Sequence, residues 1–472
     1  MIQPASVAAV NRYGLGARPG ELATVDADAR EWLTGQVGGA AEPRPELSSL
    51  TPGETIAAEY FSAVGDRPRR RSERRSDSDP SRDFVQKLAA GVRQVLLPHY
   101  LAQSQARLRA AVATRQPFRE RLAHFWSNHF SVSIDKPAVL GLAGALENEV
   151  IRPSLAGRFA DLLLAVERHP AMILYLDNQV SVGPNSALAR SLGKRTRAAR
   201  KPDINENLAR EILELHTLGV DGGYTQGDVT ALATVLTGWS VGGGQGWLAE
   251  GTPGQALFRA NVHEPGARTV LGRHYAEDGV RQGEAVLRDL ARHPSTARHV
   301  ATKLVRHFVA DQPPQPAIAH VERAFLASEG DLPAVHRAVA DTLAGYPSLP
   351  AKYKTPQDYV ISAFRGLELP VPDPRAALAP FELLGQRPWS PGSPAGWPDR
   401  AGDWDGADAL MKRIEFAERL SQRLGNDRPA LEAGESMLGP ALRADTRSSL
   451  RRAASGSQAV ALLLLCPEFL RR

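Results

Sequence analysis

One fifteen-residue stretch concentrates the side chains that could do chemistry. Residues 205–219 read Asn-Glu-Asn-Leu-Ala-Arg-Glu-Ile-Leu-Glu-Leu-His-Thr-Leu-Gly. On a helix that turns about 100° per residue, the apolar side chains of this stretch share one arc. Asn207, Glu211 and Glu214 follow one another along the edge of that arc. Polar groups at the margin of a buried face line pockets, so the pattern predicts a site here.

Glu211 and Glu214 are the leading candidate pair of catalytic side chains. Carboxylates three residues apart on a helix converge on one point. Such a pair suits a divalent metal ion, which prefers oxygen ligands, and it also suits general acid–base catalysis. The alternative is that one carboxylate pairs with an arginine and the other faces solvent. Glu211 borders the apolar arc, where a carboxylate without a function is costly to bury. The functional and the structural interpretation of the pair therefore have equal weight.

An imidazole could reach the same site from a second motif. Asn128 and His129 end an aromatic helical segment. We therefore include His129 with Glu211 and Glu214 as a candidate catalytic side chain and metal ligand. The competing interpretation, a core histidine with satisfied hydrogen bonds, is slightly favoured for His129.

Other side chains near these motifs are candidate binding residues. His216 lies eleven residues from Asn205, at the other end of the helix, so the two cannot hold one ion. We expect His216 to cap carbonyl groups at the helix end. His169 and His293 each precede a proline and are expected to act as N-caps, which could still line a cleft. The candidate binding residues are Asn128, Asn205, Asn207, Arg210, His216, Tyr224, Trp239, His169 and His293.

Two aromatic residues and the intervening turn have competing explanations. Tyr224 and Trp239 could form an aromatic wall for a sugar or a base, and aromatic core is an equal alternative. The Asp-Gly-Gly-Tyr-Thr turn at 221–225 lacks the alternating acids of a calcium loop. Thr225 and Asp228 instead predict a capping box for the next helix. The chain has no dinucleotide, phosphate-loop, zinc-protease or serine-hydrolase motif.

The same motifs carry a resemblance to a known family. Residues 205–219, with the Asp-Gly-Gly-Tyr that follows them, resemble the hallmark of the bacterial family catalogued as domain of unknown function 1800. Further matching segments are Phe-Trp-Ser-Asn-His-Phe at 125–130, Arg-His-Pro-Ala-Met at 168–172, Leu-Thr-Gly-Trp at 236–239 and His-Pro-Ser-Thr-Ala-Arg at 293–298. The resemblance spans nearly the whole chain and implies no particular reaction. Members often look exported and are often encoded beside another uncharacterised family, which implies a protein partner.

The elements that must position these side chains are almost all helices. Hydrophobic periodicity predicts a predominantly α-helical, multi-helix array with one short β-hairpin near 258–272. We expect one globular unit over 1–472, with a disordered insert at about 65–83 and a basic mobile loop at about 187–202. Predicted helices include 117–130, 203–218, 226–237, 295–310 and 355–366, with Asp203 as a candidate N-cap, and residues 388–404 read as an irregular crossing.

Composition narrows the class of protein. A hydrophobic content of 43% with 23% charged residues is ordinary for a soluble globular chain. The net charge is +5, but residues 190–201 alone carry +6, so the remainder carries −1 and a distributed nucleic-acid surface is not expected. No apolar run is long enough for a membrane span, and no secretory signal is visible, so we expect the cytoplasm. The single cysteine, Cys466, excludes an internal disulfide framework.

Two functions from different classes fit this sequence. The first is a hydrolase-like enzyme with a polar Glu/His/Asn pocket, a divalent metal as its candidate cofactor, and an anionic or polymeric substrate. The second is a non-catalytic binding or assembly protein, in which the 203–218 helix is a buried polar network that joins helices. A carboxylate–histidine cluster open to a pocket favours the enzyme, whereas a closed and fully paired Arg210–Glu211 network favours the second function.

Overall fold

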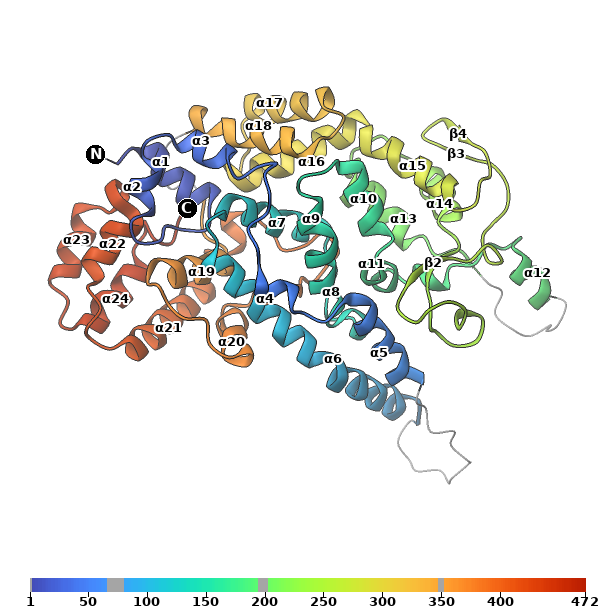
Figure 1. Cartoon of the computed structure of the whole chain (residues 1–472), viewed down its shortest axis with the longest axis horizontal. Coiled ribbons are helices and arrows are strands. Elements are labelled where there is room, and N and C mark those ends of the chain that lie inside the picture. The colour runs from blue at the N-terminus through green and yellow to red at the C-terminus, as the bar shows by residue number, and fades with distance from the viewer. Residues whose placement is uncertain (1, 66–79, 194–202, 347–351) are drawn as a thin grey trace.

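Helices dominate the described chain, as the hydrophobic periodicity predicts (Figure 1). The structure, a computed structural model, describes residues 2–65, 80–193, 203–346 and 352–472. Most of the expected insert at 65–83 and of the expected basic loop at 187–202 lies outside these residues. In their described parts, residues 80–83 begin one helix and residues 187–193 form another.

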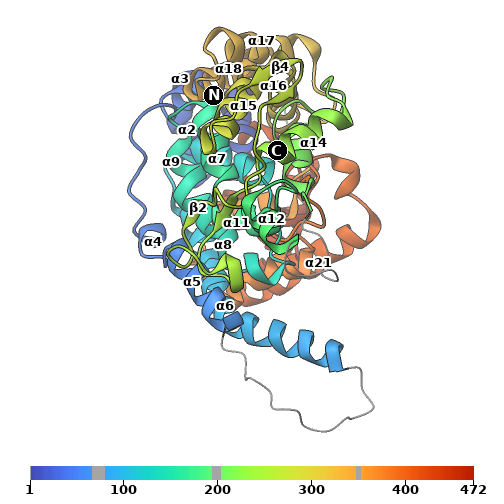
Figure 2. The same cartoon turned by 90° about the vertical axis from the view of Figure 1, so that its right-hand side faces the viewer.

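The helices of the first half include α7, the helix that ends in Asn128 and His129. They are α1 (Pro4–Ala8), α2 (Glu21–Val25), α3 (Ala29–Thr34), α4 (Pro45–Ser48), α5 (Gly53–Gly65), α6 (Pro80–Ala113), α7 (Pro117–His129), α8 (Leu142–Ala145), α9 (Arg152–Ser154), α10 (Phe159–Glu167), α11 (Pro170–Tyr175), α12 (Ala187–Gly193), α13 (Asn207–Glu211) and α14 (Gln226–Val235). Figure 2 shows α6 extending from the body at the end opposite α17 and α18.

The helices of the second half run from α15 to α24, and the last four of them form one end of the molecule. They are α15 (Val280–Arg292), α16 (Pro294–Phe308), α17 (Gln315–Ala327), α18 (Leu332–Gly345), α19 (Pro356–Gly366), α20 (Pro374–Leu384), α21 (Ala407–Leu424), α22 (Ala430–Leu438), α23 (Ala444–Arg451) and α24 (Gly456–Leu465). In Figure 1, α21–α24 gather beside α1 and α2, and α13–α15 lie toward the other end.

Three described segments are π-helical. They are η1 (Ala9–Tyr13), η3 (Leu146–Ile151) and η5 (Ile212–His216). Short 3₁₀ turns are η2 (Pro137–Val139), η4 (Asn178–Val180), η6 (Gly246–Leu248), η7 (Ala401–Asp403) and η8 (Gly439–Ala441). A π segment widens the helix and releases backbone groups from the regular ladder, and such segments recur at functional sites. Here η3 carries the buried Glu147 and η5 carries His216.

Strands occur in the predicted stretch, but they pair differently from the prediction. β1 (Trp239–Val241) pairs with β2 (Ala256–Phe258), and β3 (Arg268–Val270) pairs with β4 (Arg273–Tyr275), both antiparallel. The single hairpin predicted near 258–272 therefore corresponds only in part to β3–β4, because residues 256–258 pair with β1 instead. The tight hairpin turn is Leu271-Gly272, where both residues have positive φ, the backbone that a two-residue hairpin requires.

Local capping signals fix most helix starts near the site. His169 Nδ1 accepts from the Ala171 N–H and His293 Nδ1 from the Ser295 N–H, which confirms both as N-caps. Thr225 and Asp228 form the predicted capping box. We call α13 with the adjoining η5 the motif helix, since residues 207–216 carry most of the motif. Asp203 is not its N-cap, because α13 begins only at Asn207 and its N-cap residue is Glu206.

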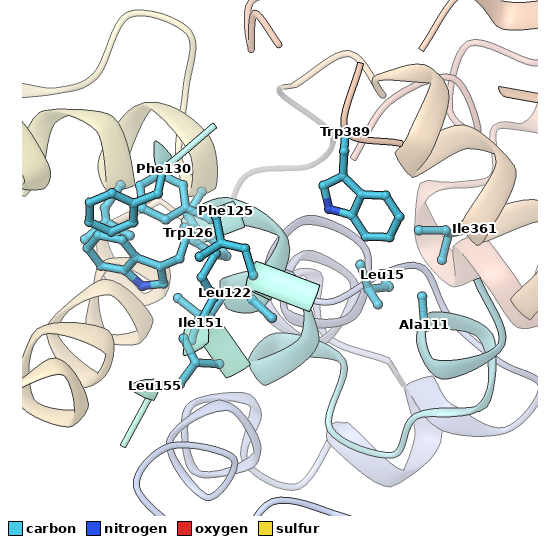
Figure 3. Packing of buried hydrophobic residues seen from close by; sticks show 14 of the residues in the cluster. Leu15, Ala111, Leu122, Phe125, Trp126, Phe130, Ile151, Leu155, Ile361 and Trp389 are labelled. Carbon is cyan, nitrogen blue, oxygen red and sulfur yellow. The ribbon is translucent and has the colours of Figure 1, made fainter. Parts of the chain in front are cut away.

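The core joins segments from both ends of the sequence. One cluster of buried hydrophobic side chains contains residues from Val7 to Leu470. Figure 3 shows part of this cluster, where Phe125, Trp126 and Phe130 gather at the end of α7. Trp126 is fully buried and its ring stacks on Phe130 at 6.0 Å. This aromatic packing fixes the end of α7, which carries Asn128 and His129.

No helix in the described residues is long and apolar enough to cross a membrane.

Candidate functional site

A cavity of about 410 Å³ opens between α7, α16, α19 and the irregular segment 386–403. Its charged and imidazole side chains are Arg107, Arg121, His124, His129, Lys303, Arg306, His307, Asp358, Asp399, Arg400 and Asp403. Five of these side chains are cationic and three are anionic, which leaves a positive excess when the histidines are neutral. An anionic ligand therefore suits the cavity better than a cation.

One face of α16 supplies the most unusual polar groups of the site. His299, Lys303 and His307 follow at intervals of four residues, so they lie above one another on the helix. The neighbouring apolar face, with Val300, Leu304 and Phe308, is buried in the core. The burial of the apolar face orients the polar face toward 386–403.

His307 and Asp399 form a base–carboxylate pair at the cavity wall. His307 Nδ1 lies 3.0 Å from Asp399 Oδ2, so Nδ1 carries the proton and Nε2 keeps its lone pair. His307 Nε2 is buried and has no hydrogen-bond partner among the described residues. Burial lowers the pKa of His307 to about 4, although Asp399 opposes the change. The imidazole is thus neutral near pH 7 and able to accept a proton.

Asp399 is also held by two cations, Lys352 near the oxygen that faces His307 and Arg472 near the other oxygen. Its carboxylate lies 3.6 Å from Lys352 Nζ and 3.4 Å from an Arg472 nitrogen. Burial opposes ionisation, but His307, Lys352 and Arg472 outweigh it, so the pKa of Asp399 is lowered. The carboxylate stays charged and keeps the imidazole tautomer fixed.

Lys303 brings an unpaired ammonium group to the same cavity. Among the described residues it has no hydrogen bond or ion pair. Burial and then the nearby Arg306 lower the pKa of Lys303 to about 8, against the attraction of Asp399. Arg306 Nε is also buried without a partner among the described residues. Burial and Arg400 lower the pKa of Arg306, so these cations repel one another when no anion is bound.

The floor of the cavity rests on buried ion pairs. Glu147 accepts from Arg107 Nε at 2.8 Å, from Arg152 at 2.7 Å and from the Trp389 indole at 3.0 Å. Burial alone would raise the pKa of Glu147, but Arg107 and Arg152 lower it to about 2. Asp358 similarly pairs with Arg121 at 2.8 Å. These pairs satisfy Arg107 and Arg121, so the free positive charge belongs to α16 and Arg400.

Asn128 holds the irregular wall segment against α7. Its amide donates to the Trp397 carbonyl at 2.9 Å and accepts from the Trp397 N–H at 2.8 Å. Gly396 has a φ of +83°, and a Cβ there would collide with the Asn128 carbonyl oxygen. Asn128 therefore lies at the cavity, where its side-chain N–H and its side-chain oxygen both position the Trp397 backbone.

His129 also lines the cavity, and it connects the cavity to the motif helix. His129 Nε2 donates to the His216 carbonyl at 3.1 Å, and His299 Nε2 donates to the Leu215 carbonyl at 3.0 Å. These carbonyls lie in η5, where helix geometry leaves them without helical partners. Burial, followed by Lys303, places the pKa of His129 well below its usual range. His129 is therefore a neutral imidazole that caps η5, with Nδ1 buried and unpartnered among the described residues.

His216 differs from its predicted role. Its side chain caps no carbonyl, because its Nδ1 bonds Glu167 Oε1 at 2.7 Å in the core. The helix end is capped instead by His129 and His299.

Glu211 and Glu214 do not reach the cavity. Both are half-buried on the motif helix, and neither is among the residues that line it. The pKa of Glu211 is raised, mainly by burial. Across the described residues, no group of three or more His, Cys, Asp and Glu side chains is arranged to hold a metal ion. Glu211, Glu214 and His129 are therefore not brought together as three ligands in the described structure. His129 lies beside His299 of α16, with 6.1 Å between the ring centres.

The remaining polar residues of the motif make structural contacts. Asn205 donates to the carbonyls of Leu176 and Asp177, both at 3.2 Å. Arg210 pairs with Glu206 at 3.2 Å and not with Glu211. The Asn207 side chain is exposed. This part of the motif ties α13 to its neighbours.

The other candidate binding residues lie away from the cavity. Trp239 is buried in β1, with the Arg168 guanidinium 5.8 Å from its ring centre. Tyr224 lies near Glu214, and its pKa is raised by burial and then by that carboxylate. His169 and His293 are engaged as N-caps. The structure therefore brings only Asn128 and His129 of the predicted site residues to the cavity.

Lys303, His307 and Asp399 are the site residues that sequence reasoning missed. The four-residue spacing of His299, Lys303 and His307 beside an apolar face was the available signal. Nothing local marks Asp399, which meets His307 across 92 residues of sequence.

The fold and the cavity define a helical protein with a charged, imidazole-containing pocket. Residues 8–471 match the model of the family described as "Protein of unknown function (DUF1800)", so the chain belongs to that family. Comparison with curated proteins and with solved structures found no match.

Proposed function

We propose that the protein is a hydrolase-like enzyme that acts on an anionic substrate in this cavity, with His307 as general base. The observation that carries the proposal is the His307–Asp399 pair: His307 lines a cavity that also holds unpaired cations, and its buried Nε2 has no hydrogen-bond partner among the described residues. A base oriented by a carboxylate and kept neutral by burial is the arrangement that general-base catalysis requires.

The proposed step is attack by water on an ester or amide bond. Water bound beside His307 gives its proton to Nε2 while its oxygen bonds to the carbonyl carbon. The carbon–heteroatom bond then breaks, and the leaving group takes the proton from Nε2. Lys303 stabilises the negative charge that develops on the carbonyl oxygen. Arg306 and Arg400 hold the anionic part of the substrate, and Asp399 keeps His307 in the reactive tautomer.

A non-catalytic binding or assembly protein is the second candidate. It is supported by the contacts of Asn205 and Glu206, which join the motif helix to neighbouring segments. In the proposed enzyme the same helix has a supporting role, because its carbonyls fix the imidazoles of His129 and His299.

The test is hydrolysis of a panel of chromogenic acetyl esters and amides, each in a neutral form and in a form that carries a carboxylate. The wild-type protein should hydrolyse a carboxylate-bearing member, and His307→Gln should slow that reaction by about 10²- to 10⁴-fold. His320→Gln on α17, outside the cavity, is the matched control. Hydrolysis that His307→Gln leaves unchanged, or no hydrolysis across the panel, would overturn the assignment.

A further inference from the structure

A second hollow adjoins the cavity along α16. Its volume is about 820 Å³, and it shares Arg306, Arg400 and Asp403 with the first cavity. Arg298 and Thr302 extend it along the helix. Eight residues separate Arg298 from Arg306, which is about 12 Å at 1.5 Å per residue. The two hollows therefore form one elongated depression with a shared, positively charged wall.

The unpaired charge lies at the shared wall and not at the far end. Arg298 pairs with Glu322 at 2.8 Å, and Asp311 pairs with Lys352 at 2.6 Å. The guanidinium groups of Arg306 and Arg400 have no carboxylate partner within 4.0 Å among the described residues. A ligand that crosses this wall thus meets two free guanidinium groups, which bind carboxylates through paired hydrogen bonds.

The first hollow adds an aromatic surface with a free donor. Trp397 lines it, and its indole N–H is buried without a partner among the described residues. Trp404 supports Trp397 at a ring separation of 5.9 Å. An aromatic face with an adjacent free N–H fits a ring that has apolar C–H faces and oxygen acceptors. A saccharide has both features, whereas an inorganic polyphosphate has no apolar face.

We propose that the two hollows together bind an acidic oligosaccharide, with one sugar against Trp397 and a carboxylate-bearing sugar across Arg306 and Arg400. This inference takes from the proposed function only the position at which the bound substrate would react. The substrate class follows from the free guanidinium groups, the free indole N–H and the length of the depression.

Binding should depend on both charge and chain length. We would titrate wild-type protein by calorimetry with mono-, di- and trigalacturonate, with uncharged galactotriose, with polyphosphate and with single-stranded DNA. Trigalacturonate should bind at least about tenfold more tightly than the monomer, since a second charged sugar reaches a free guanidinium group. Galactotriose should bind at least about tenfold more weakly than trigalacturonate. Polyphosphate or DNA that binds more tightly than trigalacturonate would overturn the saccharide assignment.

Three variants locate the effect. Thr302→Trp fills the second hollow and should remove the length dependence. Arg306→Met with Arg400→Met should reduce trigalacturonate affinity about tenfold or more. Arg323→Met, an exposed change on α17, should alter neither. Melting curves of each variant verify that it is folded, and length dependence that survives Thr302→Trp in a folded protein contradicts the proposal.

The outcomes for the two proposals are distinguishable. Length-dependent binding that persists in His307→Gln, without hydrolysis by the wild type, would keep the saccharide site and overturn the enzyme. Hydrolysis of small esters without charge- or length-dependent binding would do the reverse.

Discussion

The motif segment 205–216, which contains the motif helix, and the cavity face of α16 use polar residues in opposite ways. In the motif helix, Glu206 and Arg210 pair over one turn, and Asn205 bonds nearby backbone. On α16, Lys303 and Arg306 have no such partner, and His307 is paired by a residue of a distant segment. Asn205, Glu206 and Arg210 of the motif are therefore paired, whereas Lys303 and Arg306 of α16 are not, although His216 Nε2 in the motif is also buried without a partner among the described residues.

This difference teaches that buried polar groups without a hydrogen-bond partner are a better guide to a binding site than a high density of polar residues. A polar group that is buried and satisfied stabilises the fold, whereas a buried group with a free donor or lone pair is ready to meet a ligand. By that measure the unpartnered His307 Nε2 and Arg306 Nε support the proposed site, and the paired Asn205 and Arg210 support a structural role.

The largest expected effect is on the buried ion pairs beneath the cavity. Glu147→Gln leaves Arg107 and Arg152 without their shared carboxylate, so it should lower the free energy of unfolding by about 3–5 kcal/mol. The pKa of Glu147 is lowered to about 2, so its contribution is full above the unfolded pKa near 4.5 and is lost as the pH falls toward 2. Chemical denaturation at pH 7 and pH 3 measures both effects.

The matched control for this change is Glu329→Gln, at an exposed position. It should change stability by less than about 0.5 kcal/mol. If Glu147→Gln were equally mild, the cavity floor would not depend on these pairs.

The next expected effect separates the two faces of the motif helix. Ile212 is fully buried, so Ile212→Ala should cost about 2–5 kcal/mol. Glu211→Gln should leave stability unchanged or slightly raised, because burial disfavours its charged form and Arg210 is paired elsewhere. It should also leave hydrolysis unchanged. Thermal melts measure the stability of both variants, and the ester assay measures hydrolysis by Glu211→Gln. A Glu211→Gln protein that is stable but inactive would show that the catalytic site includes the motif helix.

A smaller effect is expected where α7 meets the cavity wall. Asn128→Ala removes both hydrogen bonds to the Trp397 backbone and should cost about 1–3 kcal/mol. The wall should loosen, so the tryptophan emission of the folded variant should shift to longer wavelength. Asn148→Ala, on η3, is the control variant, and its tryptophan emission should not shift. An unchanged spectrum in Asn128→Ala would show that Trp397 is held by other contacts.

The smallest expected change is in the pH dependence of hydrolysis. The reaction rate should rise as His307 loses its proton near pH 4 and fall as Lys303 loses its charge near pH 8. Lys303→Arg keeps the charge at high pH, so it should extend activity above pH 8. Lys412→Arg on α21 should leave the profile unchanged. A profile that Lys303→Arg does not alter would remove Lys303 from the mechanism.

Much of the fold followed from local pattern, and only part of the site did. The predicted helices 117–130 and 295–310 correspond to α7 and α16, because each has an apolar stripe and a proline at its start. The motif helix was predicted from residue 203 but begins at Asn207, because the Asn205 side chain bonds the carbonyls of Leu176 and Asp177 instead. Segment 388–404 was read only as irregular, although it supplies Trp397 and Asp399.

The sequence by itself determined the helical class, the N-caps at His169 and His293, and the capping box at Thr225. Each of these depends on contacts between residues that are close in sequence, and such contacts can be predicted from the residue types and their spacing. Only the tertiary structure decided that His307 meets Asp399, that His129 caps the His216 carbonyl, and that Lys303 is left without a partner. Those outcomes depend on which distant groups the packed core brings within hydrogen-bond distance, and on how far it removes them from water.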